Sequence, residues 1–92
     1  MTDELMLNVA VCVSGGGTNL QTLIDAKQAG RLPLVRLAVV IASRPGTKAE
    51  ARAKAAGIPC LIISKRDYEN QEAYDLAMID ALRPYEIGLV VL

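Results

Sequence analysis

Residues 7–19 read Leu-Asn-Val-Ala-Val-Cys-Val-Ser-Gly-Gly-Gly-Thr-Asn, and this stretch decides the fold. The nearly continuous apolar run 7–13 is rich in valine and predicts a strand that is covered on both faces, as in a parallel sheet. The turn from Ser14 to Gly17 ends the run. Apolar residues then recur at helical spacing, so Thr18 or Asn19 is positioned to cap a helix. A strand, a glycine-rich turn and a helix in this order form the first unit of an α/β fold.

The same alternation continues along the rest of the chain. Right-handed crossovers turn such a chain into a parallel, doubly wound sheet with helices on both faces. We therefore predict a Rossmann-like, three-layer α/β fold with strand order 3-2-1-4, incomplete at its carboxyl end. The expected strands are residues 7–13, 34–42, 60–63 and 87–92, and the expected helices lie between Thr18 and Gly30, between Thr47 and Gly57, and from about Asn70 to Leu82.

Length and composition limit the functions open to this chain. Its 92 residues make one small domain or part of a larger one, and residues 1–92 are treated as a single unit. The sequence has no histidine, which excludes imidazole base catalysis, Ser-His or Cys-His pairs and histidine-ligated metals within these residues. Ten basic residues balance ten acidic ones, so no strong field attracts nucleic acid or an anionic membrane.

The two cysteines do not form a disulfide framework. Cys12 and Cys60 both lie in aliphatic strands, and no Cys-x-x-Cys pair for zinc is present. In the predicted strand order one strand separates them, which places their Cα atoms roughly 10 Å apart, too far for a disulfide. We expect buried free thiols and a cytoplasmic location. The amino-terminal residues 1–4 are acidic and do not resemble a signal peptide, and no apolar run approaches the length of a membrane span.

The glycine loop predicts an anion site. Gly15, Gly16 and Gly17 allow the backbone to approach a ligand closely, and the helix that follows contributes unpaired N–H groups and the positive end of its dipole. Thr18 and Asn19 add side-chain donors. A tight turn alone would need only one or two glycines, so we interpret the loop as a phosphate site.

Motif residues that are missing from the loop and its surroundings limit which phosphate ligands fit it. Leu20 stands where the third glycine of a dinucleotide fingerprint belongs, and Ser43-Arg44 stands where its acidic residue belongs, which disfavours NAD. Arg44 keeps an NADP 2′-phosphate open as an alternative. No Gly-Lys-Ser/Thr follows the loop, so the P-loop pattern is absent. The terminal phosphate of a small substrate is the simplest fit.

The loop and its surroundings resemble phosphoribosylglycinamide formyltransferase, a folate-dependent family of purine biosynthesis. The stretch 11–21 matches the family's apolar strand, Ser-Gly, variable residue, Gly-Ser-Asn-Leu-Gln, with Thr18 keeping the hydroxyl of the serine. Residues 55–59, 72–75 and 89–92 are similar in kind and in order, so the resemblance covers essentially the whole chain. The loop motif is fairly specific, and the later stretches are supportive.

The resemblance implies a substrate and a co-substrate. The loop would bind the phosphate of glycinamide ribonucleotide, and 10-formyltetrahydrofolate would supply the formyl group. The family's catalytic Asn, His and Asp follow the strand that matches 89–92, so none of them is expected within this chain, which we predict to be inactive alone. The family's basic folate-side residue corresponds to Gln71, which we carry over as a folate contact or as an exposed residue of a helix start. The implied substrate-binding residues are Ser14, Gly15, Gly16, Gly17, Thr18 and Asn19.

Two other readings remain open. A related hydrolase, formyltetrahydrofolate deformylase, usually has a regulatory domain before this first strand, whereas about six residues precede it here. A stand-alone phosphate- or nucleotide-binding module would need no histidine. The aliphatic run 87–92 would leave an exposed sheet edge, which leads us to expect the amino-terminal part of a longer protein. We expect the acidic residues of 67–80 and the basic residues Lys48, Arg52 and Lys54 to be solvated.

Overall fold

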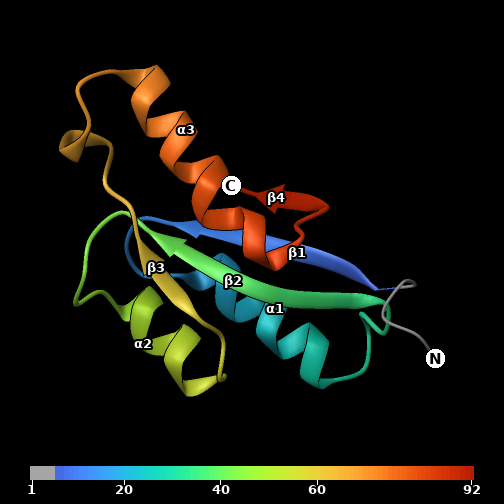
Figure 1. Ribbon diagram of the computed structural model, residues 1–92. Helices are drawn as coiled ribbons and strands as arrows, with labels where there is room; N and C mark the ends of the chain where they lie inside the picture. Colours follow the sequence, from blue (N-terminus) through green and yellow to red (C-terminus); the bar gives the residue numbers. More distant parts are fainter. Residues whose placement is uncertain (1–5) are drawn as a thin grey trace.

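A computed structural model describes residues 6–92 and confirms the predicted α/β fold (Figure 1). All strand pairs are parallel and the sheet has the order β3-β2-β1-β4, which is the predicted order 3-2-1-4. Strands and helices alternate, because a parallel pair of consecutive strands needs a crossover connection. The elements are β1 (Leu7–Val13), α1 (Thr18–Gln28), β2 (Val35–Ala42), α2 (Lys48–Ala55), β3 (Cys60–Ile62), α3 (Gln71–Leu82) and β4 (Leu89–Val91), with short 3-10 turns η2 (Lys65–Asp67) and η3 (Arg83–Tyr85).

Helices cover both faces of the sheet and make three layers. Figure 1 shows α1 and α2 on one face and α3 on the other. The core on the side of α1 and α2 contains Val9 and Val11 of β1 with Leu20 of α1. The opposite core contains Ala10 of β1 and Val39 of β2, covered by side chains of α3. Alternate residues of β1 therefore serve both cores, which explains why its sequence is apolar throughout.

An irregularity in β2 preserves this alternation. Val9 pairs with Leu37 and Ala10 pairs with Val39, so Ala38 is an extra residue in the ladder. Before it, the odd-numbered Leu37 packs on the side of α1 and α2, whereas after it the even-numbered Val40 does so. A bulge of one residue shifts side chains to the other face of a strand. The bulge thus lets a long strand keep apolar residues on both faces.

Two of the three helix starts follow the sequence prediction. The Thr47 hydroxyl accepts a hydrogen bond from the Glu50 amide at 3.2 Å and caps α2, at the boundary expected for this helix. The Asn70 side chain accepts from the Ala73 amide at 2.8 Å and caps α3. The prediction for α1 was wrong, because neither Thr18 nor Asn19 is the cap. The cap residue is Gly17, without a side-chain hydrogen bond.

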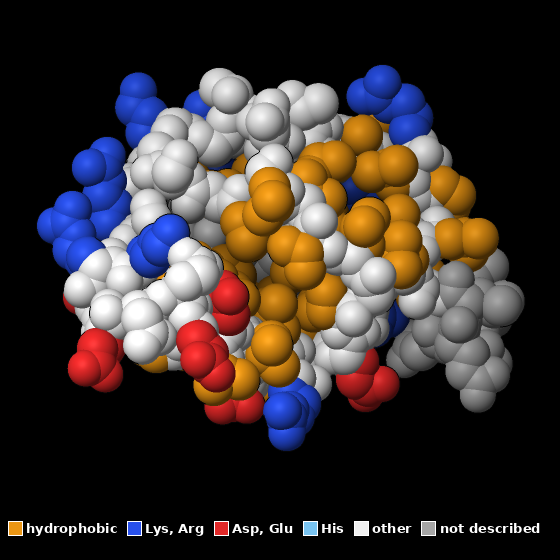
Figure 2. Space-filling view, turned by 90° about the horizontal axis from the view of Figure 1, so that it is seen from above, with side chains coloured by type: hydrophobic (Ala, Val, Ile, Leu, Met, Phe, Trp, Pro, Cys, Tyr) orange, Lys and Arg blue, Asp and Glu red, His pale blue; other side chains and the backbone are white. Residues whose placement is uncertain are grey.

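The surface of α3 and β4 carries exposed hydrophobic side chains. Figure 2, seen from the side of α3, shows hydrophobic atoms gathered on this face. β4 is an edge strand, and an exposed edge is a template for pairing with a further strand. Leu92, just after it, is 91% exposed. The exposed large side chains of α3 and β4 are Leu76, Ile79, Leu89 and Val90.

The cysteines lie in different cores. Cys12 packs in the core covered by α3, and Cys60 packs in the core covered by α1 and α2. Strand β2 separates their strands, and both thiols are free, as predicted, but both residues are half-buried rather than fully buried as expected. None of the helices in residues 6–92 is long and apolar enough to span a membrane.

Burial perturbs both thiols. It raises the pKa of Cys12, and it raises the pKa of Cys60 together with a smaller effect of the negative charge of Glu50. We expect both to react with a disulfide reagent at pH 7.5 more slowly than free cysteine does.

Because the folded pKa values are raised, the thiols stabilise the fold below the ordinary cysteine pKa, and this contribution is lost as pH rises through the folded values. Unfolding curves at alkaline pH should therefore show a steeper loss of stability than curves of the Cys12→Ala, Cys60→Ala double variant, and equal slopes would contradict the shifts.

Candidate functional site

The glycine loop lies at the carboxyl edge of the sheet, where α/β folds bind ligands. It connects the end of β1 to the start of α1, and the six residues singled out from the sequence, 14–19, line one hollow of about 290 Å³. Cys12 and Val13 of β1 and Leu92 beyond β4 complete the lining. The hollow therefore lies between the loop and the carboxyl end of the edge strand.

Helix α2 determines which way the loop faces. The Ala49 amide donates to the Gly15 carbonyl at 3.1 Å, and the Arg52 Nε donates to the Gly16 carbonyl at 2.8 Å. The described chain has no cis peptide, and in a trans peptide the N–H points opposite to the C=O. The N–H groups of Gly16 and Gly17 therefore point away from α2, and neither donates to another group of residues 6–92.

The start of α1 adds further donors. The first intrahelical bond runs from the Gln21 amide to the Gly17 carbonyl at 2.9 Å, so the amides of Thr18, Asn19 and Leu20 lack a helical acceptor. The side chains of Thr18 and Asn19 are exposed. Amides at the positive end of a helix dipole, next to a hydroxyl and a carboxamide, are suited to an oxyanion. The loop can therefore hold a phosphate without any charged side chain of its own.

The reason for a glycine differs among the three positions of the loop. A Cβ at Gly17 would lie 2.7 Å from Ala49 Cβ and 2.8 Å from Ala49 Cα, and its φ is +73°. Both this φ and the packing against α2 therefore require glycine at position 17. A Cβ at Gly15 or Gly16 would meet nothing within 4 Å. Protein packing does not demand glycine at these two positions, so their bare backbone leaves room for a ligand.

Arg52 is a positioning residue that the sequence analysis missed. We expected it to be solvated, but it is half-buried and bridges α2 to the loop. Besides the bond to Gly16, its Nη1 donates to Gln21 Oε1 at 3.0 Å, and Gln21 Nε2 donates to Asp25 Oδ1 at 2.8 Å. The chain of bonds ties the loop to both α1 and α2. Lys48 and Lys54 of the same helix are exposed, as expected.

Other residues considered in the sequence lie at the surface. Gln71 is exposed at the start of α3, and its Nε2 donates to Asp75 Oδ1 at 2.7 Å, which agrees with the reading as a polar helix-start residue. A folate contact at Gln71 stays a prediction. The acidic side chains Asp67, Glu69, Glu72, Asp75 and Asp80 are all exposed, as predicted. Arg44 lies at the carboxyl edge and lines a hollow of about 500 Å³ with Gly15 and Gly16.

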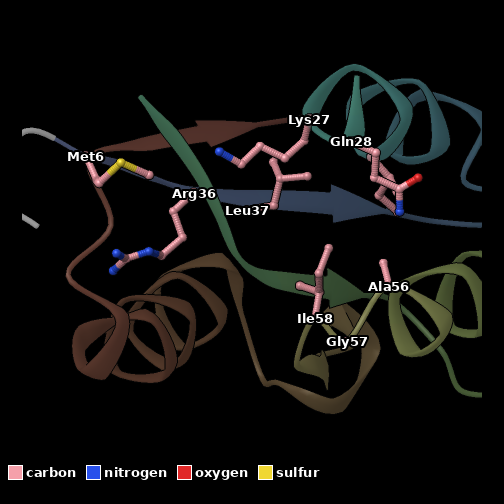
Figure 3. Close-up of a pocket in the computed structure, with 9 residues that line it drawn as sticks. Met6, Lys27, Gln28, Arg36, Leu37, Ala56, Gly57 and Ile58 are labelled. Carbon is pink, nitrogen blue, oxygen red and sulfur yellow. The ribbon is translucent and has the colours of Figure 1, made fainter. Parts of the chain in front are cut away.

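A more apolar hollow lies at the opposite end of the sheet (Figure 3). It encloses about 310 Å³ between the ends of α1 and α2, with Leu37 and Ile58 in its wall. Figure 3 shows the Lys27 side chain extending from α1 toward Leu37, whereas the Arg36 side chain points away on the other side of β2. Lys27 Nζ donates to the Leu32 carbonyl at 3.0 Å and so closes the α1–β2 connection. This hollow is far along the strands from the glycine loop, and its lysine has a structural role.

Comparisons with known proteins identify the family of this chain. The sequence profile described as formyl transferase matches residues 7–92. The chain belongs to the formyl transferase family. It is similar to phosphoribosylglycinamide formyltransferase of Haemophilus influenzae, with 38% identity over 95% of this chain and 41% of that protein. It is also similar to the trifunctional purine biosynthetic protein adenosine-3 of Drosophila melanogaster, with 37% identity over 100% of this chain and 7% of that protein.

Solved structures show the same fold. Glycinamide ribonucleotide transformylase 1 of Geobacillus kaustophilus superposes with a TM-score of 0.85 at 34% identity, over 92% of this chain and 45% of that one. A formyltetrahydrofolate deformylase of Pseudomonas putida superposes with a TM-score of 0.79 at 19% identity, which shows a shared fold alone. The chain thus spans less than half the length of these relatives. The resemblance to the formyltransferases noted in the sequence is confirmed.

Proposed function

We propose that residues 1–92 are the substrate-phosphate-binding part of a folate-dependent formyltransferase that acts on glycinamide ribonucleotide in purine biosynthesis. Two observations together carry the proposal. The chain belongs to the formyl transferase family, and its glycine loop turns the N–H groups of Gly16 and Gly17 away from the helix that holds it. The similarity to phosphoribosylglycinamide formyltransferase and glycinamide ribonucleotide transformylase supports glycinamide ribonucleotide as the substrate. A cytoplasmic location is part of the same proposal and is supported by the two free cysteines.

The loop would hold the substrate through its phosphate. Gly16 and Gly17 would donate their amides, and the first turn of α1 would add its amides and the positive end of its dipole. Thr18 and Asn19 would donate from their side chains. Binding through the remote phosphate orients the reacting amine, and orientation of this kind lowers the barrier of a group transfer.

The formyl transfer itself needs groups that move protons. The substrate amine attacks the formyl carbon of 10-formyltetrahydrofolate, and a tetrahedral intermediate collapses with loss of the folate nitrogen. The amine must lose a proton and the leaving nitrogen must gain one. This sequence has no histidine, and its acidic residues between 67 and 80 are exposed. We propose that the proton-transferring groups and most of the folate pocket belong to a further part of the protein, which would also cover the apolar edge at β4.

A stand-alone phosphate-binding module is the second candidate, because the absence of histidine fits a domain without chemistry. The two candidates differ in ligand selectivity. A transferase part should prefer glycinamide ribonucleotide, whereas a general phosphate module should bind ribose 5-phosphate or AMP equally well. A deformylase fragment would bind no ribonucleotide at the loop.

An NMR titration with glycinamide ribonucleotide tests the proposal. We expect the amide resonances of residues 15–19 to shift, and Asn19→Ala to weaken binding about fivefold through loss of one hydrogen bond. Gln28→Ala, an exposed residue at the far end of α1, serves as the control and should leave binding unchanged. With 10-formyltetrahydrofolate added, we expect no transfer by this chain alone. Resonance shifts outside residues 15–19 alone would contradict the proposed phosphate site. Detectable formyl transfer would show that the catalytic groups lie within residues 1–92.

A further inference from the structure

A second polar hollow lies beside the glycine loop at the same edge of the sheet. Each of three parallel strands is followed by a serine within two residues: Ser14 follows β1, Ser43 follows β2 and Ser64 follows β3. Because β3, β2 and β1 are neighbours, their carboxyl ends bring the three serines to one hollow of about 530 Å³. This volume is within the range of small-molecule sites, about 300–1,000 Å³. We call it the serine–arginine hollow, and its lining is Ser14, Ser43, Arg44, Pro45, Ile62, Ser64, Arg66 and Asp67.

Two guanidinium groups give the serine–arginine hollow its charge. Arg44 follows β2 and Arg66 lies in η2, and both are exposed. Within residues 6–92, neither side chain takes part in a hydrogen bond or an ion pair, in contrast to Arg52. Asp67 is the one acidic residue in the lining. The lining therefore has a charge excess of one positive unit, carried by the planar donor groups that recognise phosphate and carboxylate best.

The hollow is adjacent to the loop but distinct from it. Ser14 lines both the serine–arginine hollow and the loop hollow. Arg44 lines the serine–arginine hollow and also the hollow shared with Gly15 and Gly16. No residue of Gly15–Asn19 lines the serine–arginine hollow itself. A ligand group there would thus be held by side chains, whereas the glycine loop offers backbone amides.

We propose that the serine–arginine hollow is a second oxyanion site, which binds a phosphate or carboxylate group of a small molecule through Arg44, Arg66 and the serine hydroxyls. It goes beyond the substrate-phosphate site of the loop, and neither site requires the other. The arginines supply the charge and paired N–H donors. The serines supply hydroxyl donors from the ends of three neighbouring strands, so they orient the group at the carboxyl edge of the sheet.

Titrations with inorganic phosphate and, separately, with succinate at constant ionic strength test this site. With at least one of the two anions, we expect resonances of residues 43–44 and 64–66 to shift. Arg44→Ala and Arg66→Ala should each weaken that binding about tenfold, as expected for loss of a charge-assisted hydrogen bond. The control Arg31→Ala removes an exposed arginine beyond α1, at the other end of the sheet, and should leave the affinity unchanged.

The outcomes distinguish the two sites. Shifts at 43–44 and 64–66 that survive Asn19→Ala and disappear in Arg44→Ala support the serine–arginine hollow, whether or not the glycine loop binds. The stronger of the two anions identifies the group as phosphate or carboxylate. If neither anion shifts these residues, or if Arg31→Ala weakens binding as much as Arg44→Ala does, the proposal is wrong.

Discussion

Replacing Gly17 by alanine is expected to lower the free energy of unfolding by about 3 kcal/mol or more. Two causes add. The residue has a φ of +73°, which costs an L-amino acid about 1–2 kcal/mol. The new methyl group would also lie 2.7 Å from Ala49 Cβ and 2.8 Å from Ala49 Cα, so α2 must move away from the loop. Chemical unfolding monitored by circular dichroism measures the loss.

Two matched variants separate these causes. Gly57 has nearly the same φ, +74°, but a Cβ there would meet nothing within 4 Å. Gly57→Ala therefore reports the backbone strain alone, and we expect a loss of about 1 kcal/mol. Gly16→Ala has neither a positive φ nor a close neighbour, and we expect a change within about 0.5 kcal/mol. If Gly17→Ala lowers the free energy of unfolding no more than Gly57→Ala does, the predicted clash of the new methyl group with Ala49 adds nothing to the cost.

The fold could be predicted from the sequence, because each strand and each α-helix has its own local pattern of apolar residues. The alternation of aliphatic runs with helical spacing predicted every strand and α-helix but not the 3-10 turns η2 and η3, and the Rossmann-like pattern gave the strand order 3-2-1-4 that the sheet has. The bulge at Ala38 was not readable. Residues 34–42 are almost all apolar, so the change of side-chain parity between Leu37 and Val40 leaves no mark in the sequence. It is set by packing against two covered faces.

The position of the glycine loop between the first strand and the first helix was predicted correctly, but the contacts of α2 that hold it were not predicted. A loop of three glycines before a helix is a strong local pattern, whereas the helix that holds it lies more than thirty residues later along the chain. A signal for Arg52 did exist. It stands three residues after Ala49 and four before Ala56, on the small-residue face of its helix, where a solvated arginine is out of place. The cap of α1 was misassigned because side-chain preference favours Thr18, while the positive φ required here selects Gly17.

Replacing Arg52 by alanine is expected to weaken phosphate binding at the glycine loop about tenfold. The substitution removes the bonds to the Gly16 carbonyl and to Gln21 Oε1, so the peptide that directs the Gly17 amide loses its anchor. An amide that must be ordered on binding contributes less affinity than one already oriented. Because the bond to Gly16 is exposed and the bond to Gln21 is only partly buried, we expect a stability loss of about 1 kcal/mol. Calorimetric titration with glycinamide ribonucleotide and unfolding curves of the same samples give both numbers.

The charge of Arg52 must be separated from its hydrogen bonds. Lys48→Ala removes the same charge from the same helix, and Lys48 lines a hollow with Gly15 and Gly16 but makes no hydrogen bond to the loop. A purely Coulombic role predicts similar losses for both variants, which shrink together as salt screens them. A positioning role predicts that Arg52→Ala loses much more than Lys48→Ala and that the difference persists at high salt. It also predicts that Arg52→Lys recovers only part of the affinity, because a lysine cannot donate to Gly16 and Gln21 with the geometry of a guanidinium. If Arg52→Ala and Lys48→Ala lose the same phosphate affinity, α2 contributes positive charge to the site and does not orient the loop.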